Sequence, residues 1–228
     1  MGDMIWAVGG FIIGLLSIMM IVLAFATPYW IQPEPGHVIS TQLQKLGLWE
    51  ICFQGYNDIR DGLGRVYNGC YWVFAREYDV IRKYLIPSWF ATAQALETLN
   101  LVLGLLCVLF GLLVLIRCLS SSAQKYTVLS LAVGYLVIGV LSAILCTFFG
   151  INAGTDRSWL KQPQFRHLAW SFYVAVIGGI IAFFASMCYV VYYMKIRKGG
   201  ETSTAYRAYE MRNYRQNHRA ASSNRFYK

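Results

Sequence analysis

Two of the six cysteines in this chain are spaced for disulfide chemistry. Cys52 and Cys70 share one long polar segment, residues 28–88, whereas the other four lie in or beside apolar stretches. In an oxidising compartment such a pair is expected to be bridged. The bridge would close a loop of about 19 residues and stabilise it by roughly 3 kcal/mol in the chain-entropy model. We therefore predict a Cys52–Cys70 disulfide, with two free thiols as the alternative.

Four charged residues between these cysteines could select ions by sign if they lined a narrow aqueous path. They are Asp58, Arg60, Asp61 and Arg65. Their charges cancel, so the sequence indicates no preference for cations or anions. A solvated loop of mixed charge is an equally simple interpretation.

The remaining candidate residues do not have the spacing of a catalytic or metal site. His37 and His167 lie in polar segments, but no nucleophile, acid pair or ligand set accompanies them. We therefore expect both to be surface residues, and we expect no enzyme, no cofactor and no metal.

Cys118 directly follows Arg117 at the end of an apolar stretch. A cysteine there is a candidate for palmitoylation, with plain packing as the alternative.

Composition and patterning place these residues in a membrane protein. The 228-residue chain is 57% hydrophobic and only 14% charged, against roughly 25% charged residues in soluble domains. The apolar residues fall into four blocks, each long enough to cross a hydrocarbon core of about 30 Å as a helix. Within a four-span domain of residues 1–194, the predicted spans are residues 5–27, 89–116, 127–149 and 168–194.

The charges near the span ends predict the orientation of the chain. The short segment between the second and third spans carries Arg117 and Lys125 and no acid. Because cytoplasmic loops are enriched in Lys and Arg, this segment and both termini are expected in the cytoplasm. The two larger loops, residues 28–88 and 150–167, are then extracellular, although the basic residues of the second loop oppose this assignment slightly; these are Arg157, Lys161 and Arg166.

The last segment, residues 195–228, is a basic tail. It carries nine Lys or Arg against two Glu, a net +7 of the chain's +9. Directly after a membrane span, such a tail indicates contact with anionic lipid or a cytoplasmic scaffold rather than with nucleic acid. Its composition favours a disordered segment.

The first outer loop has the pattern of a small antiparallel sheet. Residues 37–43, 48–53 and 65–68 are β-prone and are separated by Pro, Gly and Asp turns. Residues 76–85 resemble a short amphipathic helix closed by Pro87. The predicted fold class is an all-α transmembrane four-helix bundle with a small extracellular antiparallel β-sheet.

Two sequence features inside the predicted spans, a pair of glycines and a carboxylate, are expected to contact another helix or another polar group. Gly10 and Gly14 form a GxxxG pair, for which packing within the bundle is favoured over dimerisation. Glu97 is the one carboxylate within a predicted span, where a charge costs about 2.5–3.5 kcal/mol at mid-bilayer. A position near the headgroups is one explanation and a hydrogen bond inside the bundle is the main alternative, ahead of a proton or ion path.

The order of Trp30, Gly47-Leu48-Trp49, Cys52 and Cys70 resembles the W-GLW-C-C signature of the claudin and peripheral myelin protein superfamily. The resemblance covers all four spans, and residues 156–173 are most similar to the invertebrate claudins of septate junctions. It implies a left-handed four-helix bundle with an extracellular β-sheet. It also implies side-by-side polymerisation with itself or other claudins in one membrane, and head-to-head contact across the gap between cells.

This resemblance predicts a plasma-membrane adhesion protein of cell–cell junctions, septate or tight, that forms or regulates the paracellular barrier. Because the loop charges cancel, a seal is favoured over a selective pore. An auxiliary or regulatory subunit of a membrane channel or receptor is the alternative, which the lack of an Asn-x-Ser/Thr glycosylation sequence disfavours. The spacing between Cys52 and Cys70 is longer than is usual in claudins. A final Lys228 does not fit the apolar pocket of PDZ scaffolds, which bind the usual claudin terminus.

Overall fold

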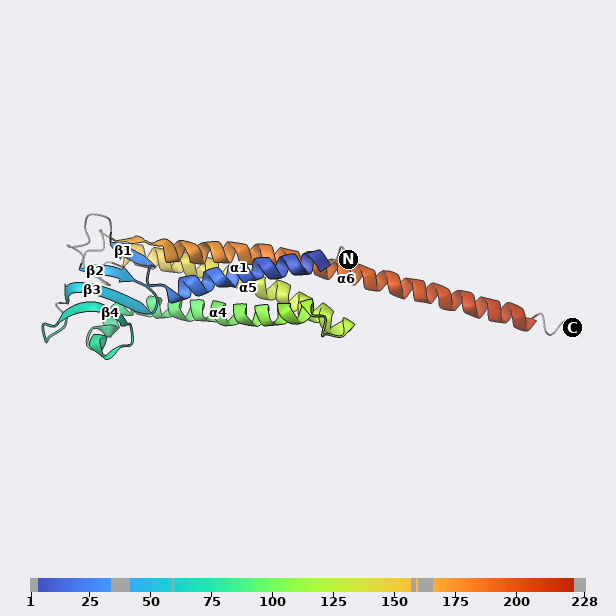
Figure 1. The fold of residues 1–228 in the computed structure, drawn as a ribbon, viewed down its shortest axis with the longest axis horizontal. Coiled ribbons are helices and arrows are strands. Elements are labelled where there is room, and N and C mark those ends of the chain that lie inside the picture. Colours follow the sequence, from blue (N-terminus) through green and yellow to red (C-terminus); the bar gives the residue numbers. More distant parts are fainter. Residues whose placement is uncertain (1–3, 34–41, 59, 157–158, 160–165, 224–228) are drawn as a thin grey trace.

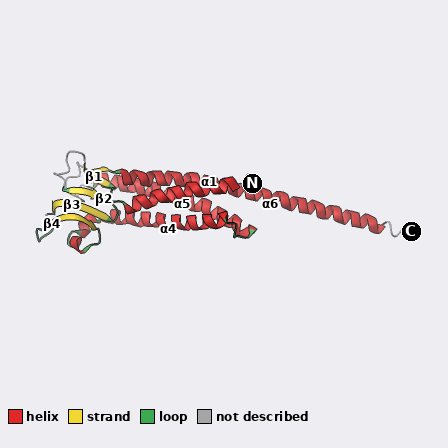
Figure 2. Ribbon diagram, viewed as in Figure 1, coloured by secondary structure: helices red, strands yellow, loops and turns green. Residues whose placement is uncertain are grey.

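Four long helices lie side by side and carry a small sheet at one end (Figures 1 and 2). The computed structural model describes residues 4–33, 42–58, 60–156, 159 and 166–223. The long helices are α1 Met4–Ala26, α4 Ser88–Leu115, α5 Ser121–Thr155 and α6 Trp170–Ser223. Each contains a stretch long and apolar enough to cross a membrane, with a mean hydropathy of 2.4 to 2.6. The predicted four-helix fold class is confirmed.

Local sequence signals set the ends of these helices. Pro28 follows the end of α1, and Pro87 occupies the N-cap of α4. After α4, Arg117 adopts a left-handed conformation with φ 54°, which stops the helix. Ser120 begins α5, because its Oγ accepts a hydrogen bond from the Ala123 backbone N–H at 3.4 Å. α5 extends beyond the predicted span 127–149 at both ends.

The basic tail is helical as far as Ser223, whereas its composition favoured a disordered segment over residues 195–228. α6 continues without interruption from the apolar span to Ser223 and projects past the other helices (Figure 1). Residues 201–223 contain Ala, Arg, Glu, Met and Gln and no Pro, so they have adequate helix propensity. They also extend an existing helix, and elongation avoids the cost of nucleation. Residues 224–228 lie outside the described part of the tail.

The sheet has five antiparallel strands in the order β4-β3-β2-β1-β5. They are β1 Ile31–Pro33, β2 Leu43–Leu46, β3 Glu50–Asn57, β4 Val66–Trp72 and β5 Arg166–Leu168. The predicted strands 48–53 and 65–68 correspond to β3 and β4, whereas most of the predicted strand 37–43 lies outside the described residues. β5, in a segment expected to be a compact loop, pairs with β1 along Ile31–Leu168, Gln32–His167 and Pro33–Arg166.

The segment predicted as one helix, residues 76–85, forms two short pieces. They are the 3₁₀ turn η1, Arg76–Tyr78, and the helix α3, Arg82–Leu85. The Arg82 guanidinium donates to the carbonyls of Phe74 and Ala75 at 3.0 Å each, which folds the segment back on the end of β4. Tyr78, Ile81 and Leu85 remain buried on one side, so the amphipathic character is kept without a continuous helix.

The GxxxG pair of α1 serves packing within this chain. A Cβ on Gly10 would lie 3.2 Å from the ring of Tyr189 on α6, and a Cβ on Gly14 would collide with the phenol of Tyr135 on α5. The rings of Tyr135 and Tyr189 stack on each other with centroids 5.7 Å apart. The small residues therefore let α1 approach two large aromatic side chains.

Glu97 of α4 points into the bundle and is 1% exposed. The Asn100 amide donates to Ser142 Oγ on α5 at 3.2 Å and reaches Glu97 Oε2 at 3.5 Å. Of the explanations offered by the sequence, this geometry corresponds to the hydrogen bond inside the bundle rather than to a position among headgroups. A polar group facing another helix avoids exposure to hydrocarbon.

Candidate functional site

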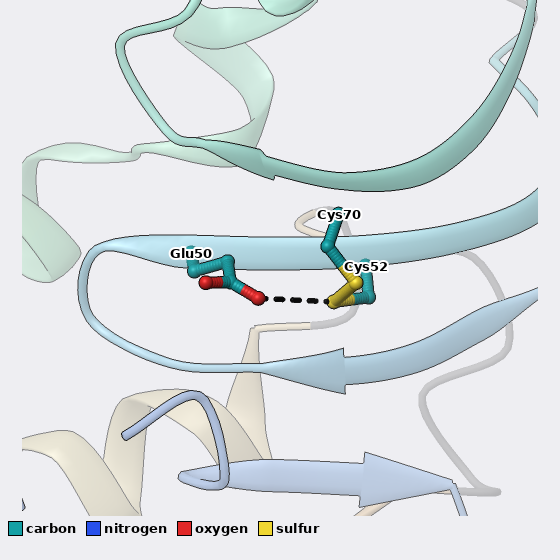
Figure 3. Close-up of side chains that lie close together, drawn as sticks. All are labelled: Glu50, Cys52 and Cys70. Carbon is teal, nitrogen blue, oxygen red and sulfur yellow. Dashed lines mark hydrogen bonds between the residues drawn. A yellow bond between two sulfur atoms is a disulfide. The ribbon is translucent and has the colours of Figure 1, made fainter. Parts of the chain in front are cut away.

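The disulfide joins directly paired positions of β3 and β4. Cys52 and Cys70 face each other in register with their Cα atoms 4.0 Å apart (Figure 3). Glu50 Oε1 lies 3.4 Å from Cys52 Sγ. Among the described residues these three side chains form the one group close enough to hold a metal ion, but both sulfurs are committed to the disulfide and cannot act as thiolate ligands.

Trp30 fixes the start of the sheet to the helices. Its side chain is fully buried, and its indole Nε1 donates to the Ala24 carbonyl of α1 at 2.7 Å. Its backbone N–H donates to the Leu46 carbonyl of β2 at 2.9 Å. The ring packs edge-on against Phe149 of α5 with centroids 4.9 Å apart. One residue thus connects α1, α5 and the sheet.

Gly47 sits where the turn between β2 and β3 presses on the end of α1. Its N–H donates to the Glu50 carbonyl at 2.8 Å, which closes the turn. A Cβ at this position would come 2.5 Å from Pro28 Cα and 2.8 Å from the Thr27 carbonyl oxygen. Both neighbours are backbone atoms and cannot rotate away, so only glycine fits.

The next two residues of the turn contact two different helices. Leu48 is fully buried, and its carbonyl accepts a hydrogen bond from Gln94 Nε2 of α4 at 2.6 Å. Trp49 packs its ring on Phe25 of α1 with centroids 5.1 Å apart. We call Trp30, Gly47, Leu48 and Trp49 the signature junction, because together they seat the sheet on α1, α4 and α5.

Trp159 attaches the second polar segment to the first, a contact that sequence reasoning missed. Its buried Nε1 donates to the Leu85 carbonyl at 2.8 Å, and its ring packs on Trp89 at 4.6 Å. A tryptophan in a polar loop and Gln94 in an apolar helix are both out of place locally. That mismatch with the local sequence was the signal by which the structural roles of these two residues could have been found.

Of the two histidines considered in the sequence, His167, in β5, is exposed, and His37 lies outside the described residues.

Asp58 and Arg60 hold the turn at the far end of β3. Asp58 is 2% exposed and forms an ion pair with Arg60 at 2.7 Å, while Tyr56 OH donates to it at 2.9 Å. The hydrogen bonds from Arg60 keep the pKa of Asp58 at about 2, below its usual value. Burial, and then the nearby Asp58 carboxylate, raise the pKa of Tyr56. The Arg60 guanidinium also stacks on Tyr84 at 4.2 Å.

Asp61 shapes the same turn, and Arg65 lies at its surface. The Asp61 carboxylate accepts hydrogen bonds from the backbone N–H groups of Leu63 and Arg65 at 3.1 Å each and from Tyr67 OH at 3.0 Å. Asp61 is buried, whereas Arg65 is exposed. The structure thus brings the four predicted charges together at one hairpin, where both carboxylates make structural hydrogen bonds.

The four membrane-length helices, the sheet at one end and the signature junction define a multi-pass plasma-membrane protein whose sheet is built directly on its helix ends. A family model described as PMP-22/EMP/MP20/Claudin tight junction matches residues 15–191, well over half of the chain. The chain therefore belongs to the claudin family in this broad sense, as its signature residues indicated. No curated protein matches it.

Replacement of Gly47 by alanine tests the close approach at the signature junction. We expect Gly47→Ala to lower the free energy of unfolding by about 1–3 kcal/mol, the usual cost of overpacking against atoms that cannot move. Thermal unfolding of the detergent-purified protein measures it. Gly62→Ala is the matched control, because nothing lies within 4 Å of a Cβ there. Equal melting temperatures of the two variants would contradict the prediction.

The lowered pKa of Asp58 predicts a pH dependence of stability. A carboxyl whose pKa falls from 3.8 to about 2 on folding stabilises the folded state above about pH 4. That contribution, at most about 2 kcal/mol, is lost as the pH falls toward 2. We expect Asp58→Asn to melt at a lower temperature at neutral pH and to lack this part of the acid destabilisation. Parallel melting curves across that pH range would show that Asp58 does not contribute.

Proposed function

We propose that this protein is an adhesion protein of cell–cell junctions that polymerises in the plasma membrane and forms or regulates the paracellular barrier. The observation that carries the proposal is the signature junction, which presents the sheet as a rigid extension of the bundle. A sheet seated in this way can repeat along a row of molecules with a fixed geometry.

The proposed orientation places the sheet outside the cell and both termini in the cytoplasm. The basic residues gather at the end of the bundle opposite the sheet, as the excess of Lys and Arg on cytoplasmic loops requires. Arg117 follows α4, Lys125 lies near the start of α5, and Lys195 lies beside Met4 and Arg117, with Lys198 one turn further along α6. The Cys52–Cys70 disulfide at the sheet end agrees with an oxidising exterior.

For side-by-side association we propose the free edge of β4. Among the described residues β4 is the last strand of the sheet, and the edge of such a strand offers N–H and C=O groups to another chain. Val66, Tyr71 and Trp72 are exposed along it. Polar edge groups together with exposed aromatic side chains suit contact with a second copy or another claudin.

For head-to-head contact we propose the turn between β3 and β4. This turn lies at the end of the molecule farthest from the basic tail (Figure 1). Leu63 at its tip is 66% exposed between Gly62 and Gly64. The hydrogen bonds of Asp61 hold the tip in one shape, so Leu63 is presented at little entropic cost.

The same hairpin favours a seal over an ion-selective pore. Asp58 and Asp61 accept hydrogen bonds within the hairpin, so their carboxylates are already engaged there. Arg60 is exposed but paired with Asp58, and Arg65 is exposed as well. We therefore propose that these residues keep the hairpin rigid rather than select ions by sign.

Expression in cells that lack junction strands tests this function. We expect the protein to accumulate at cell–cell contacts and to form strands visible by freeze-fracture, with septa in thin section if it is of the septate type.

A substitution at the hairpin tip tests the proposed head-to-head contact. Leu63→Asp should reduce accumulation at contacts several-fold because it puts a charge on the apolar tip. Gln54→Glu is the control, since it adds the same charge on β3, away from the tip and from the β4 edge, and keeps an oxygen for Gln44 Nε2. Diffuse distribution together with co-purification of a channel would instead support an auxiliary-subunit role.

Cys118 is proposed as the palmitate acceptor. It is an exposed free cysteine at the proposed cytoplasmic end of α4, where an acyl chain could enter the adjacent leaflet. We expect Cys118→Ser to abolish labelling by a palmitate analogue in cells, whereas Cys188→Ser, within the α6 span, should leave it unchanged. Retained labelling of the Cys118 variant would assign the acyl chain elsewhere.

A further inference from the structure

A pocket of about 410 Å³ opens at the ends of the helices opposite the sheet. Its lining comes from all four long helices or their ends: Met4 of α1, Arg117 after α4, Gln124 of α5, and Tyr192 and Lys195 of α6. None of the residues that line it is acidic. The pocket therefore combines two cations with neutral hydrogen-bonding groups.

The polar groups of the pocket are already oriented. Gln124 Nε2 donates to Tyr192 OH at 3.0 Å, and Tyr192 OH in turn points at Met4 Sδ at 3.6 Å. A thioether is a weak acceptor. The Tyr192 hydroxyl can therefore turn to a stronger acceptor, such as a phosphate oxygen, without losing a strong hydrogen bond.

The charge around the pocket suits an anion of high charge density. Arg117 can donate two parallel hydrogen bonds to phosphate, and Lys195 adds a second positive charge. Gln124 lies in the first turn of α5, whose N-terminus adds partial positive charge. Two full charges and a helix N-terminus match a phosphomonoester, which approaches a double negative charge at neutral pH, better than a singly charged phosphodiester.

The surroundings of the pocket place it at the level of lipid headgroups. Ile5 and Ile116 are exposed and adjoin the lining residues Met4 and Arg117 in the chain, and Trp6 and Tyr126 are exposed aromatic residues at the same end of the bundle. Such apolar and aromatic side chains are typical of a membrane–water interface. A ligand with its phosphate in the pocket would have acyl chains beside the helices.

We propose that this pocket binds the phosphomonoester headgroup of an anionic lipid in the adjacent leaflet, for which a phosphorylated inositol lipid is the probe. The proposal rests on the orientation given under Proposed function, which places this end in the cytoplasm. Arg117 and Lys195 hold the phosphate oxygens, and Tyr192 donates a further hydrogen bond. The basic residues of α6 beyond the pocket raise the local concentration of anionic lipid but do not form the site.

Binding of lipid to the full-length protein in nanodiscs tests the proposal. The discs contain phosphatidylcholine with either phosphatidylinositol 4,5-bisphosphate or phosphatidylserine at matched total charge, and bound lipid is counted by native mass spectrometry. We expect retention of the phosphorylated inositol lipid and at least about tenfold weaker retention in Arg117→Gln/Lys195→Gln. Lys198→Gln/Arg212→Gln removes the same charge outside the pocket and should change retention less than about twofold.

Two further measurements separate the contribution of the Tyr192 hydroxyl and of the acyl chains from that of charge. Tyr192→Phe preserves the ring and the net charge and should weaken retention several-fold through loss of one hydroxyl. Soluble inositol 1,4,5-trisphosphate should compete poorly, because it lacks the acyl chains. Equal losses in the two double variants, or equal affinity for the soluble phosphate, would overturn the proposal. Because the discs contain no cell contacts, these outcomes do not depend on whether the protein forms junctions.

Discussion

Gly47 packs directly on the backbone of Thr27 and Pro28, and this contact seats the sheet on the helix bundle. At this point a β-turn touches the end of a membrane helix with no side chain between them. The close approach allows Leu48 to reach the core and Trp49 to lie on Phe25. Without it the sheet would sit further from the bundle, and the hydrogen bond from Gln94 to Leu48 could not form. Every proposed role of the sheet edge and tip requires this fixed seat.

Polar side chains complete the attachment from the membrane side. Gln94 is 5% exposed on α4 and donates its hydrogen bond across to the turn rather than within its own helix. Deeper in the bundle, Asn100 donates to Ser142 of α5 and also reaches Glu97 of its own helix. Apolar packing between helices in lipid is weakly directional, so such contacts help to fix how the helices are rotated and shifted against one another. The bundle thus gains a defined arrangement where the sheet rests on it.

The sequence predicted those parts of the fold that depend on a local pattern of residues. Apolar block length predicted the four spans, and the signature residues around Trp30 and Gly47 indicated the family. It was insufficient for β5 and for the contact of Trp159 with Leu85, because three-residue pairing and a single long-range hydrogen bond leave no periodicity. The roles of Asp58 and Asp61 were equally inaccessible, since charge counts do not reveal which carboxylates accept backbone hydrogen bonds. Composition also does not predict that α6 continues to Ser223, because it takes no account of the helix that precedes the tail.

The pairing of β5 with β1 gives α6 a mechanical role. β5 leads directly into α6, and the backbone N–H groups of Ala169 and Ser171 donate to the carbonyls of Trp30 and Tyr29 at 2.9 and 3.0 Å. α6 then runs as one unbroken helix of 54 residues to Ser223. Tension applied to its far end is therefore transmitted along the helix and loads the β1–β5 hydrogen bonds in shear. A pull on one side of the bilayer would be shared between the packing of α6 on α1 and α5 and the strand that closes the sheet on the other side.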